Sequence, residues 1–217
     1  TGGMTKGEIT VVAGRPGHFK STMTINIVSN LLNRDMKVLV FNREMSNVEM
    51  MKKLMIIESE SLSYHTMRMG DFSESDKEEL ELAKKKIKDK YKNLIMYDDV
   101  FDIVKLLTYG MSALLVSQLN RACEDRSNKR PILRDLRDSG SIEQDAEMIL
   151  FMYYDWRYNY QDSLVGEHGI EVVLGKNRYG KTGSQVLGVV GDRCKILNKP
   201  EDAMTEMKRL KRSKNES

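Results

Sequence analysis

The sequence predicts an α/β fold in which a mostly parallel central sheet is flanked by helices. Continuous apolar runs bounded by polar residues are typical of strands buried on both faces of such a sheet. Four of these runs occupy residues 9–13, 38–41, 94–97 and 113–116. Between the first two runs, apolar residues recur at helical spacing, which makes a strand, loop, helix and strand unit. The loop of that unit contains two glycines and ends in Lys-Ser.

Size and composition limit the possible classes of protein. A chain of 217 residues can bury one good core, and its hydrophobic (40%) and charged (31%) content is typical of soluble globular proteins. A net charge of +3 does not by itself indicate a nucleic-acid partner, although Lys and Arg cluster locally. Cys123 and Cys194 lack disulfide or zinc spacing, and we expect reduced thiols in a cytoplasmic protein. We find no signal peptide or membrane-spanning run, and the start at Thr1, just before the first strand, suggests part of a longer protein.

The loop after the first strand is predicted to bind phosphate. Its sequence is Gly14-Arg15-Pro16-Gly17-His18-Phe19-Lys20-Ser21-Thr22. Backbone N–H groups and a helix N-terminus form an anion site, Lys20 can reach the outer phosphates, and the Ser21 hydroxyl can hold Mg²⁺. Phe19 departs from the pattern because a second glycine is expected there. A loop that only turns the chain is the alternative, and His18 either contacts phosphate or is solvated.

A polar residue after one further strand extends the candidate site. In open α/β sheets, ligands bind at the carboxyl ends of the strands. Glu44 follows the run 38–41 and is therefore expected near the phosphates. For Glu44 the alternative is an ordinary carboxylate at a helix start, because residues 46–49 form a capping-box pattern.

The rest of the chain contains further elements but fewer candidate residues. Residues 50–57 predict a Met-rich helix that packs in the core, and a strongly charged helix is expected to open at residues 75–78 and run to Lys90. His65 and His168 are isolated and receive no role. Further apolar runs occupy 148–154, 169–174 and 186–190, and the last is expected to pair as a hairpin. Residues 204–214 predict a basic helix or a disordered tail.

The order of these motifs resembles the motor domain of DnaB-type replicative helicases, which has a RecA-like P-loop NTPase fold with a C-terminal β-hairpin. The resemblance covers most of the chain. The motifs that carry it are Ala13-Gly14-Arg15-Pro16 with Lys20-Ser21, Phe41 to Met45, Leu115 to Arg121, Arg130-Pro131, Leu136 to Asp145, and Gly175 to Arg178, with minor support from Arg68-Met69-Gly70.

The resemblance implies catalytic roles for several of these residues. Lys20 and Ser21 would bind the β/γ-phosphates and Mg²⁺, and Glu44 would polarise the attacking water. Gln118 would sense the γ-phosphate and link it to the DNA loops. Lys176 and Arg178 match a basic pair that reaches into the neighbouring subunit's site, where an arginine stabilises the transferring phosphoryl group. On the residues alone, a basic hairpin turn explains this pair equally well.

Arg137, Asp138 and Gly140 match the loop by which the family holds single-stranded DNA in a central channel. One arginine, exposed backbone N–H groups and a glycine can hold phosphates without reading bases. Residues 141–144 also form a good helix start, and the two interpretations are compatible.

One departure from the family concerns the strand whose final aspartate supports Mg²⁺. It should lie between the strands that end here at Asp98 and Gln118, but only residues 100–112 separate them, too few for a strand with two crossovers. We therefore expect internal segments to be missing between residues 99 and 113. Asp102, in a run that resembles the family pattern, is the favoured Mg²⁺ residue. Asp98 is its rival, and a simple helix-start carboxylate is the alternative for Asp102.

The expected protein is an ATP-hydrolysing motor domain (residues 1–198) of a hexameric replicative DNA helicase, followed by a basic tail (199–217). ATP and Mg²⁺ are the implied cofactors. Single-stranded DNA, further copies of the chain, and a primase and a helicase loader bound through other regions are the implied partners. The implied location is the cytoplasm, or the host cytoplasm for a phage protein, without membrane contact. A RecA/RadA-type recombinase is one alternative. A degenerate P-loop protein that binds nucleic acid without turnover is the other, motivated by Phe19.

Overall fold

The computed structural model describes residues 3–42, 45–97, 107–139 and 141–215. The chain forms two compact units. The first comprises Thr1–Ser21, Asp102–Gly188 and Asn198–Asp202, and the second comprises Thr22–Phe101, Val189–Leu197 and Ala203–Ser217. Each unit is described by itself below.

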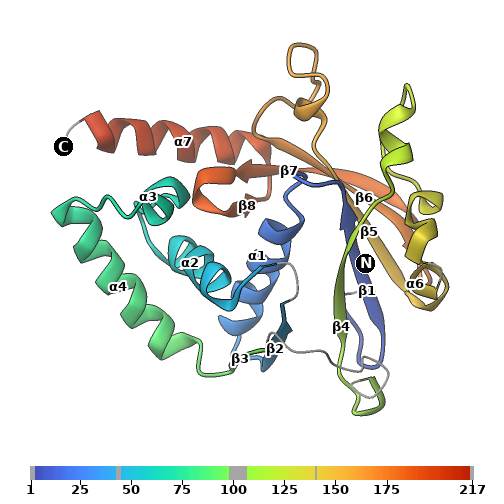
Figure 1. Cartoon of the computed structure of the whole chain (residues 1–217), viewed down its shortest axis with the longest axis horizontal. Helices are drawn as coiled ribbons and strands as arrows, with labels where there is room; N and C mark the ends of the chain where they lie inside the picture. The colour runs from blue at the N-terminus through green and yellow to red at the C-terminus, as the bar shows by residue number, and fades with distance from the viewer. Residues whose placement is uncertain (1–2, 43–44, 98–106, 140, 216–217) are drawn as a thin grey trace. The chain divides into compact units, whose positions relative to one another are not determined.

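A twisted sheet with the strand order β4-β1-β5-β6-β7 forms the first unit (Figure 1). Its central strand β1 (Ile9–Gly14) runs parallel to β4 (Ala113–Gln118) on one side and to β5 (Met148–Tyr153) on the other. β6 (Gly169–Asn177) pairs antiparallel with β5. All six residues of β1 are buried, which explains why its sequence is a continuous apolar run ending in glycine.

Short helices follow the strand ends of the first unit. They are η1 (Arg121–Asp125), η2 (Leu133–Ser139), α6 (Ser141–Asp145) and η3 (Asp155–Arg157). The core lies between this layer and the sheet, and its buried members are Ile9, Val11, Ala13, Leu119, Cys123, Leu136, Ala146, Ile149 and Phe151. Residues from η1 and η2 therefore belong to the same core as the central strand.

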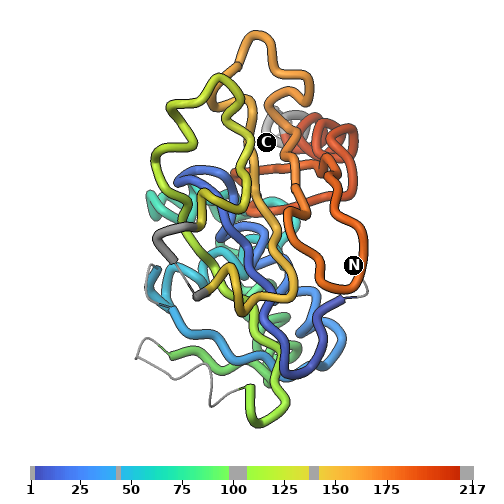
Figure 2. The backbone as a smooth tube through the Cα atoms, turned by 90° about the vertical axis from the view of Figure 1, so that its right-hand side faces the viewer, coloured from blue at the N-terminus to red at the C-terminus, as the bar shows by residue number. Residues whose placement is uncertain are grey.

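The predicted C-terminal β-hairpin is confirmed. β7 (Gly183–Val190) pairs antiparallel with β6, from Gly169 opposite Gly188 to Leu174 opposite Gly183. The loop 154–168 precedes β6 at one end of this hairpin, and the turn 178–182 closes it at the other (Figure 2). The residues that precede β6 and the residues that follow it therefore lie at opposite ends of the strands.

Helices pack against a two-stranded parallel pair in the second unit. β2 (Val38–Phe41) and β3 (Leu94–Tyr97) form the pair. The helices are α1 (Lys20–Leu32, which begins in the first unit), α2 (Asn47–Glu58), α3 (Tyr64–Met69), α4 (Glu74–Lys90) and α7 (Pro200–Asn215). The short elements η4 (Gly191–Arg193) and β8 (Lys195–Leu197) directly precede α7 in the chain. Apolar residues of α1, α2 and α4 form the core of this unit, and they include Ile25, Val28, Leu32, Met50, Leu54 and Ile87.

The predicted strands and helices are present, but β2 and β3 form a pair of their own outside the central sheet, β6 and β7 are each three residues longer than predicted, and two helices start earlier. α4 begins at Glu74, one residue before the predicted opening at Ser75, because Ser73 is the N-cap and forms a reciprocal capping box with Asp76. The tail forms a helix that begins at Pro200, four residues before the predicted start, since proline is well tolerated in the first helical turn. Among the helices that the structure describes, none has the length and apolar character needed to cross a membrane.

Candidate functional site

The predicted phosphate loop joins the carboxyl end of β1 to the start of α1. Gly14 ends β1 where no side chain fits, because a Cβ there would lie 2.9 Å from the Met152 carbonyl oxygen. Gly17 has φ +79°, a left-handed conformation that favours glycine. The loop thus follows directly from a buried central strand and leads into a helix N-terminus, which is the geometry of an anion site.

Lys20 and Ser21 are the first two residues of α1. The Lys20 side chain is buried and its Nζ donates a hydrogen bond to the Arg15 carbonyl oxygen at 3.0 Å. The ammonium group is therefore held across the loop and not directed into solvent. Ser21 is half-buried beside it, in the helix turn that follows the loop.

Phe19 takes the backbone conformation of the glycine that it replaces. Its φ is +57°, one of three positive values among the described non-glycine residues. The Phe19 ring meets the Tyr154 ring edge to face, with centroids 4.9 Å apart and planes at 84°. Tyr154 directly follows β5, so the neighbouring strand end supplies an aromatic contact to a strained loop residue. The loop keeps a glycine-like shape despite the substitution.

His18 points inward, and the expectation that it is solvated is wrong. Its side chain is buried, with Nδ1 3.2 Å from the Met152 carbonyl oxygen and 3.3 Å from the Tyr154 backbone nitrogen. Burial lowers the pKa of His18 to about 4, and the positive charges of Arg157 and Lys20 contribute, although the Met152 carbonyl opposes the shift. The ring is neutral near pH 7 and serves as packing behind the loop, so any contact of this residue with phosphate would come from its backbone.

Arg15 ties the loop to the segment that follows β4. Its Nη1 donates to the Leu119 carbonyl oxygen at 2.8 Å, and its Nη2 lies 3.0 Å from Glu124 Oε2. The Tyr158 hydroxyl donates to the other Glu124 oxygen at 2.8 Å. The hydrogen bonds from Arg15 and Tyr158 lower the pKa of Glu124, and the same carboxylate raises the pKa of Arg15. The pair is therefore fully charged at neutral pH.

Gln118 lies at the same sheet edge as the loop. It is the last residue of β4 and is in register with Gly14, the last residue of β1. Its side chain is exposed at that edge. The structure thus brings the predicted phosphate sensor to the strand end next to the phosphate loop.

Lys176 and Arg178 lie at the other end of the strands from the phosphate loop. Asn177 is in register with Met148, which is itself in register with Thr10, so the end of β6 is level with the start of β1. Lys176 Nζ donates to the Glu143 carbonyl oxygen at 2.7 Å, and Arg178 Nη1 forms an ion pair with Glu147 at 3.0 Å. The distance from Thr10 to Gly14 along a strand is roughly 13 Å, more than a side chain spans. Within one chain the pair cannot reach the phosphate loop.

The predicted DNA-contact residues are placed by their backbone. Arg137 and Asp138 belong to η2, which packs through Leu136 into the core of the first unit.

Gly140, Glu44 and Asp102 lie outside the described residues, as does Asp98. Thr22 is buried in α1. No cluster of three or more carboxylate, imidazole or thiol groups with metal-binding geometry occurs within the described part of the chain.

Sequence reasoning missed the segment 153–160, although a signal for it existed. Its residues Tyr154, Arg157 and Tyr158 all lie near the phosphate loop, and a side chain added at Gly17 would overlap the Arg157 guanidinium group. The segment follows the carboxyl end of β5, and parallel neighbours of β1 must end at the edge that holds the loop. Glu124 was missed because only the fold brings it to Arg15.

Comparisons with known proteins agree with this geometry. The family model described as DnaB-like helicase C terminal domain matches residues 1–108 and 105–197. A replicative DNA helicase DnaB of Buchnera aphidicola subsp. Acyrthosiphon pisum (strain APS) is 30% identical over 234 residues, covering 85% of this chain and 50% of that protein. Replicative DNA helicase DnaC of Bacillus subtilis (strain 168) is 26% identical over 247 residues, covering 91% and 54%. The chain thus spans about half the length of these curated relatives.

Solved structures show the same fold. One structure, titled as an ATPase domain, superposes with a TM-score of 0.80 at 23% identity, covering 89% of this chain and 85% of that one. A structure titled as a DnaB-like replicative helicase and its interactions with primase gives a TM-score of 0.78 at 22% identity, covering 90% and 58%. The predicted RecA-like α/β fold is therefore confirmed.

Proposed function

Because the chain belongs to the family of DnaB-like helicase C-terminal domains, we propose that it is the ATP-driven motor of a replicative DNA helicase. The observation that carries this proposal is the phosphate loop itself. Lys20 is held across a loop that joins a buried strand to a helix, and Gln118 ends the adjacent strand at the same level. This arrangement suits nucleotide binding next to a group that can respond to the γ-phosphate. The alternative of a loop that only turns the chain explains neither feature.

ATP with Mg²⁺ is the proposed nucleotide. The loop N–H groups and Lys20 would bind the phosphates, and the Ser21 hydroxyl would contact the metal ion. Mg²⁺ in such sites is held by phosphate oxygens, water and one or two protein oxygens, so a hydroxyl at the helix start fits it. By the family resemblance, Glu44 would polarise the attacking water and Asp102 would support the metal ion. When bound, Mg²⁺ supplies charge that offsets the phosphates.

The second half of the catalytic site is proposed to come from another copy of the chain. The positions of Lys176 and Arg178, at the sheet edge away from their own phosphate loop, support a role in trans. Arg178 is more than half exposed and holds Glu147 through one terminal nitrogen, so its guanidinium group can exchange that partner for a phosphate. A ring of six copies would repeat this shared site at every interface.

Single-stranded DNA is the proposed track. Arg137, Asp138 and Gly140 would contact its phosphate backbone, and hydrolysis would move their loop along the strand. A primase and a loader would bind through other parts of the protein, in the cytoplasm. Phe19 gives little support to a protein without turnover, because the loop retains the glycine-like φ at that position.

DNA-stimulated ATP hydrolysis by the wild-type chain and by Lys20→Ala tests the proposal. We expect the wild type to show stimulation that rises with protein concentration as copies assemble, and Lys20→Ala to lose turnover. Lys84→Ala is the matched control, since Lys84 is an exposed lysine paired with Glu81 on α4. Equal, negligible rates in the wild type and Lys20→Ala would overturn the motor proposal. Full turnover by a proven monomer would overturn the shared site, and filaments in place of rings in electron micrographs would favour a recombinase.

A further inference from the structure

We propose that Glu124 is a positioning residue that couples the phosphate loop to the segment carrying Arg137 and Asp138. This inference rests on the proposed function, because it concerns how nucleotide state reaches the DNA contact. It differs from the predicted role of Gln118, which lies in the strand end itself. The evidence is a continuous chain of contacts within the first unit.

The first link joins the phosphate loop to Glu124. Both carboxylate oxygens are occupied, one by the Arg15 guanidinium and the other by the Tyr158 hydroxyl. The Arg15 side chain is only 11% exposed, and its second terminal nitrogen bonds to the Leu119 carbonyl oxygen. The Tyr158 ring also meets the His18 ring, with centroids 5.5 Å apart. Two loop residues therefore contact the Glu124 and Tyr158 pair, and a shift of the loop must displace Glu124 or break these bonds.

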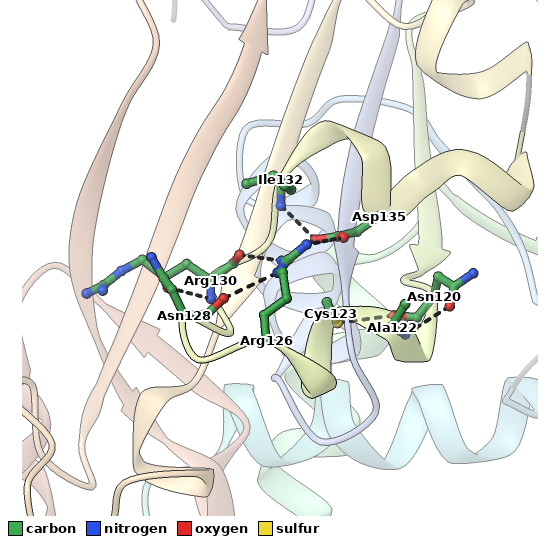
Figure 3. A network of polar contacts seen from close by, with 8 residues as sticks. All are labelled: Asn120, Ala122, Cys123, Arg126, Asn128, Arg130, Ile132 and Asp135. Atoms are coloured by element: carbon green, nitrogen blue, oxygen red, sulfur yellow. Dashed lines mark hydrogen bonds and ion pairs between the residues drawn. The ribbon is translucent and has the colours of Figure 1, made fainter.

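The second link is the set of hydrogen bonds within the segment 120–135, of which Figure 3 shows those around Arg126 and Asp135 and those around Asn120. Arg126 donates from both terminal nitrogens to the two oxygens of Asp135, at 2.7 and 2.8 Å. The Asp135 side chain is 4% exposed, so water cannot readily replace this bidentate contact. The Asn120 N–H donates to the Asp135 carbonyl oxygen at 3.0 Å, which joins the two ends of the segment.

Further contacts brace the middle of the same segment. Lys129 Nζ donates to the carbonyl oxygens of Glu124 and Arg126, at 2.8 and 3.0 Å. Arg126 also donates to the Arg130 carbonyl oxygen at 2.9 Å, a contact drawn in Figure 3. Because Glu124 is bonded through Lys129 and Arg126 to Asp135, residues 120–135 can move as one body.

The third link is covalent. Asp135 is in η2, which runs from Leu133 to Ser139 and contains Arg137 and Asp138. Asp135 is the buried partner of Arg126. Arg137 lies in the same turn of η2 as Asp135. If Glu124 is displaced, the whole segment 120–135 moves with it, and the backbone of Arg137 and Asp138 is displaced as well.

The experiment measures the affinity for labelled single-stranded DNA by fluorescence anisotropy, with a non-hydrolysable ATP analogue and with ADP. The readout is the ratio of the two dissociation constants, which a general loss of folded protein does not change. We expect the wild-type chain to show a ratio different from one, and Glu124→Gln to bring it at least about fivefold closer to one, as coupling energies of this class predict. Tyr158→Phe removes only the hydroxyl contact with Glu124 and should reduce the ratio partly.

Asp135→Asn and its double variant with Glu124→Gln test whether the two contacts act in series. If they do, the double variant loses no more of the ratio than the stronger single variant. The matched control is Glu81→Gln, which removes an exposed ion pair with Lys84 on α4 and should leave the ratio unchanged. A wild-type ratio far from one that Glu124→Gln and Tyr158→Phe both preserve would overturn the role of Glu124 alone. A wild-type ratio of one would overturn the proposed motor function as well.

Discussion

Phe19 offers a direct test of how the phosphate loop is held. It has a positive φ of 57°, a conformation in which an L-residue is strained and glycine is not. Replacing it by alanine or by glycine removes the ring in both cases. The two variants then differ only in the Cβ atom, so their difference in stability combines the strain of that atom with the extra backbone freedom that glycine loses on folding.

The expected difference follows from two opposing terms. A Cβ in the left-handed region costs about 1–2 kcal/mol, whereas glycine costs about 0.5–1 kcal/mol more than alanine in lost backbone freedom. We therefore expect Phe19→Gly to be more stable than Phe19→Ala, by up to about 1.5 kcal/mol. At ordinary backbone positions the order is the reverse. Separately, the edge-to-face contact with Tyr154 should give a coupling of about 0.5–1.5 kcal/mol between Phe19→Ala and Tyr154→Ala.

Urea unfolding of the variants measures both quantities, with an unchanged m-value as the check that the denatured state is the same. Binding of an ATP analogue should follow the same order, because a loop that holds its shape is organised for phosphate. If Phe19→Ala proved as stable as Phe19→Gly and bound the analogue equally well, the argument for a strained loop position would fail.

Three further substitutions test other parts of the structure. Burial holds the pKa of His18 at about 4, below its usual value near 6.5. The stability from its neutral ring is therefore present above about pH 6.5 and lost as the pH falls toward 4. Up to about 3 kcal/mol of unfolding free energy should disappear over that range, and His18→Gln should flatten the slope in urea titrations. Burial raises the pKa of Glu58, but hydrogen bonds from Tyr91 and Lys90 outweigh it and leave the pKa lowered. Its stabilisation is present above the unfolded pKa and lost as the pH falls through the folded one, so Glu58→Gln should weaken the acid dependence of unfolding, and an unaltered dependence would contradict this. The guanidinium of Arg193 is buried and donates to two backbone carbonyls. Arg193→Met should therefore lower the unfolding free energy by about 1–3 kcal/mol, whereas equal or greater stability would refute the role of these bonds.

The strands were predictable because their signal is local. β2 and β3 coincide with the apolar runs 38–41 and 94–97, which end where polar residues begin. The expectation that these strands are buried on both faces is wrong, because β2 is half-buried and Ile95 and Tyr97 of β3 are exposed. The start of α4 differs from the predicted one by a single residue, because both Ser73 and Ser75 could cap the helix. Only the reciprocal bonding of Ser73 with Asp76 selects between them.

The segment 120–135 was not predictable in structure, although its basic composition was evident. It has no apolar period, and its shape depends on side chains that bond to backbone carbonyls and to Asp135. The inward orientation of the His18 side chain was not predictable for the same reason, because its partner Met152 lies 134 residues away in the sequence. Contacts of this kind become visible only when the sheet order is known.

Arg126 and Arg178 differ in how their guanidinium groups are attached. Arg126 is 21% exposed and holds the 4% exposed carboxylate of Asp135 through two short bonds, so removing Arg126 would leave a buried charge uncompensated. Arg178 is 56% exposed and holds Glu147, which is 15% exposed, through one terminal nitrogen. An arginine that contacts the phosphate of a neighbouring subunit must be able to give up its partner within its own chain, whereas an arginine that transmits a displacement must keep its partner. The exposure of the two guanidinium groups and the number of their bonds suit Arg178 to the first role and Arg126 to the second.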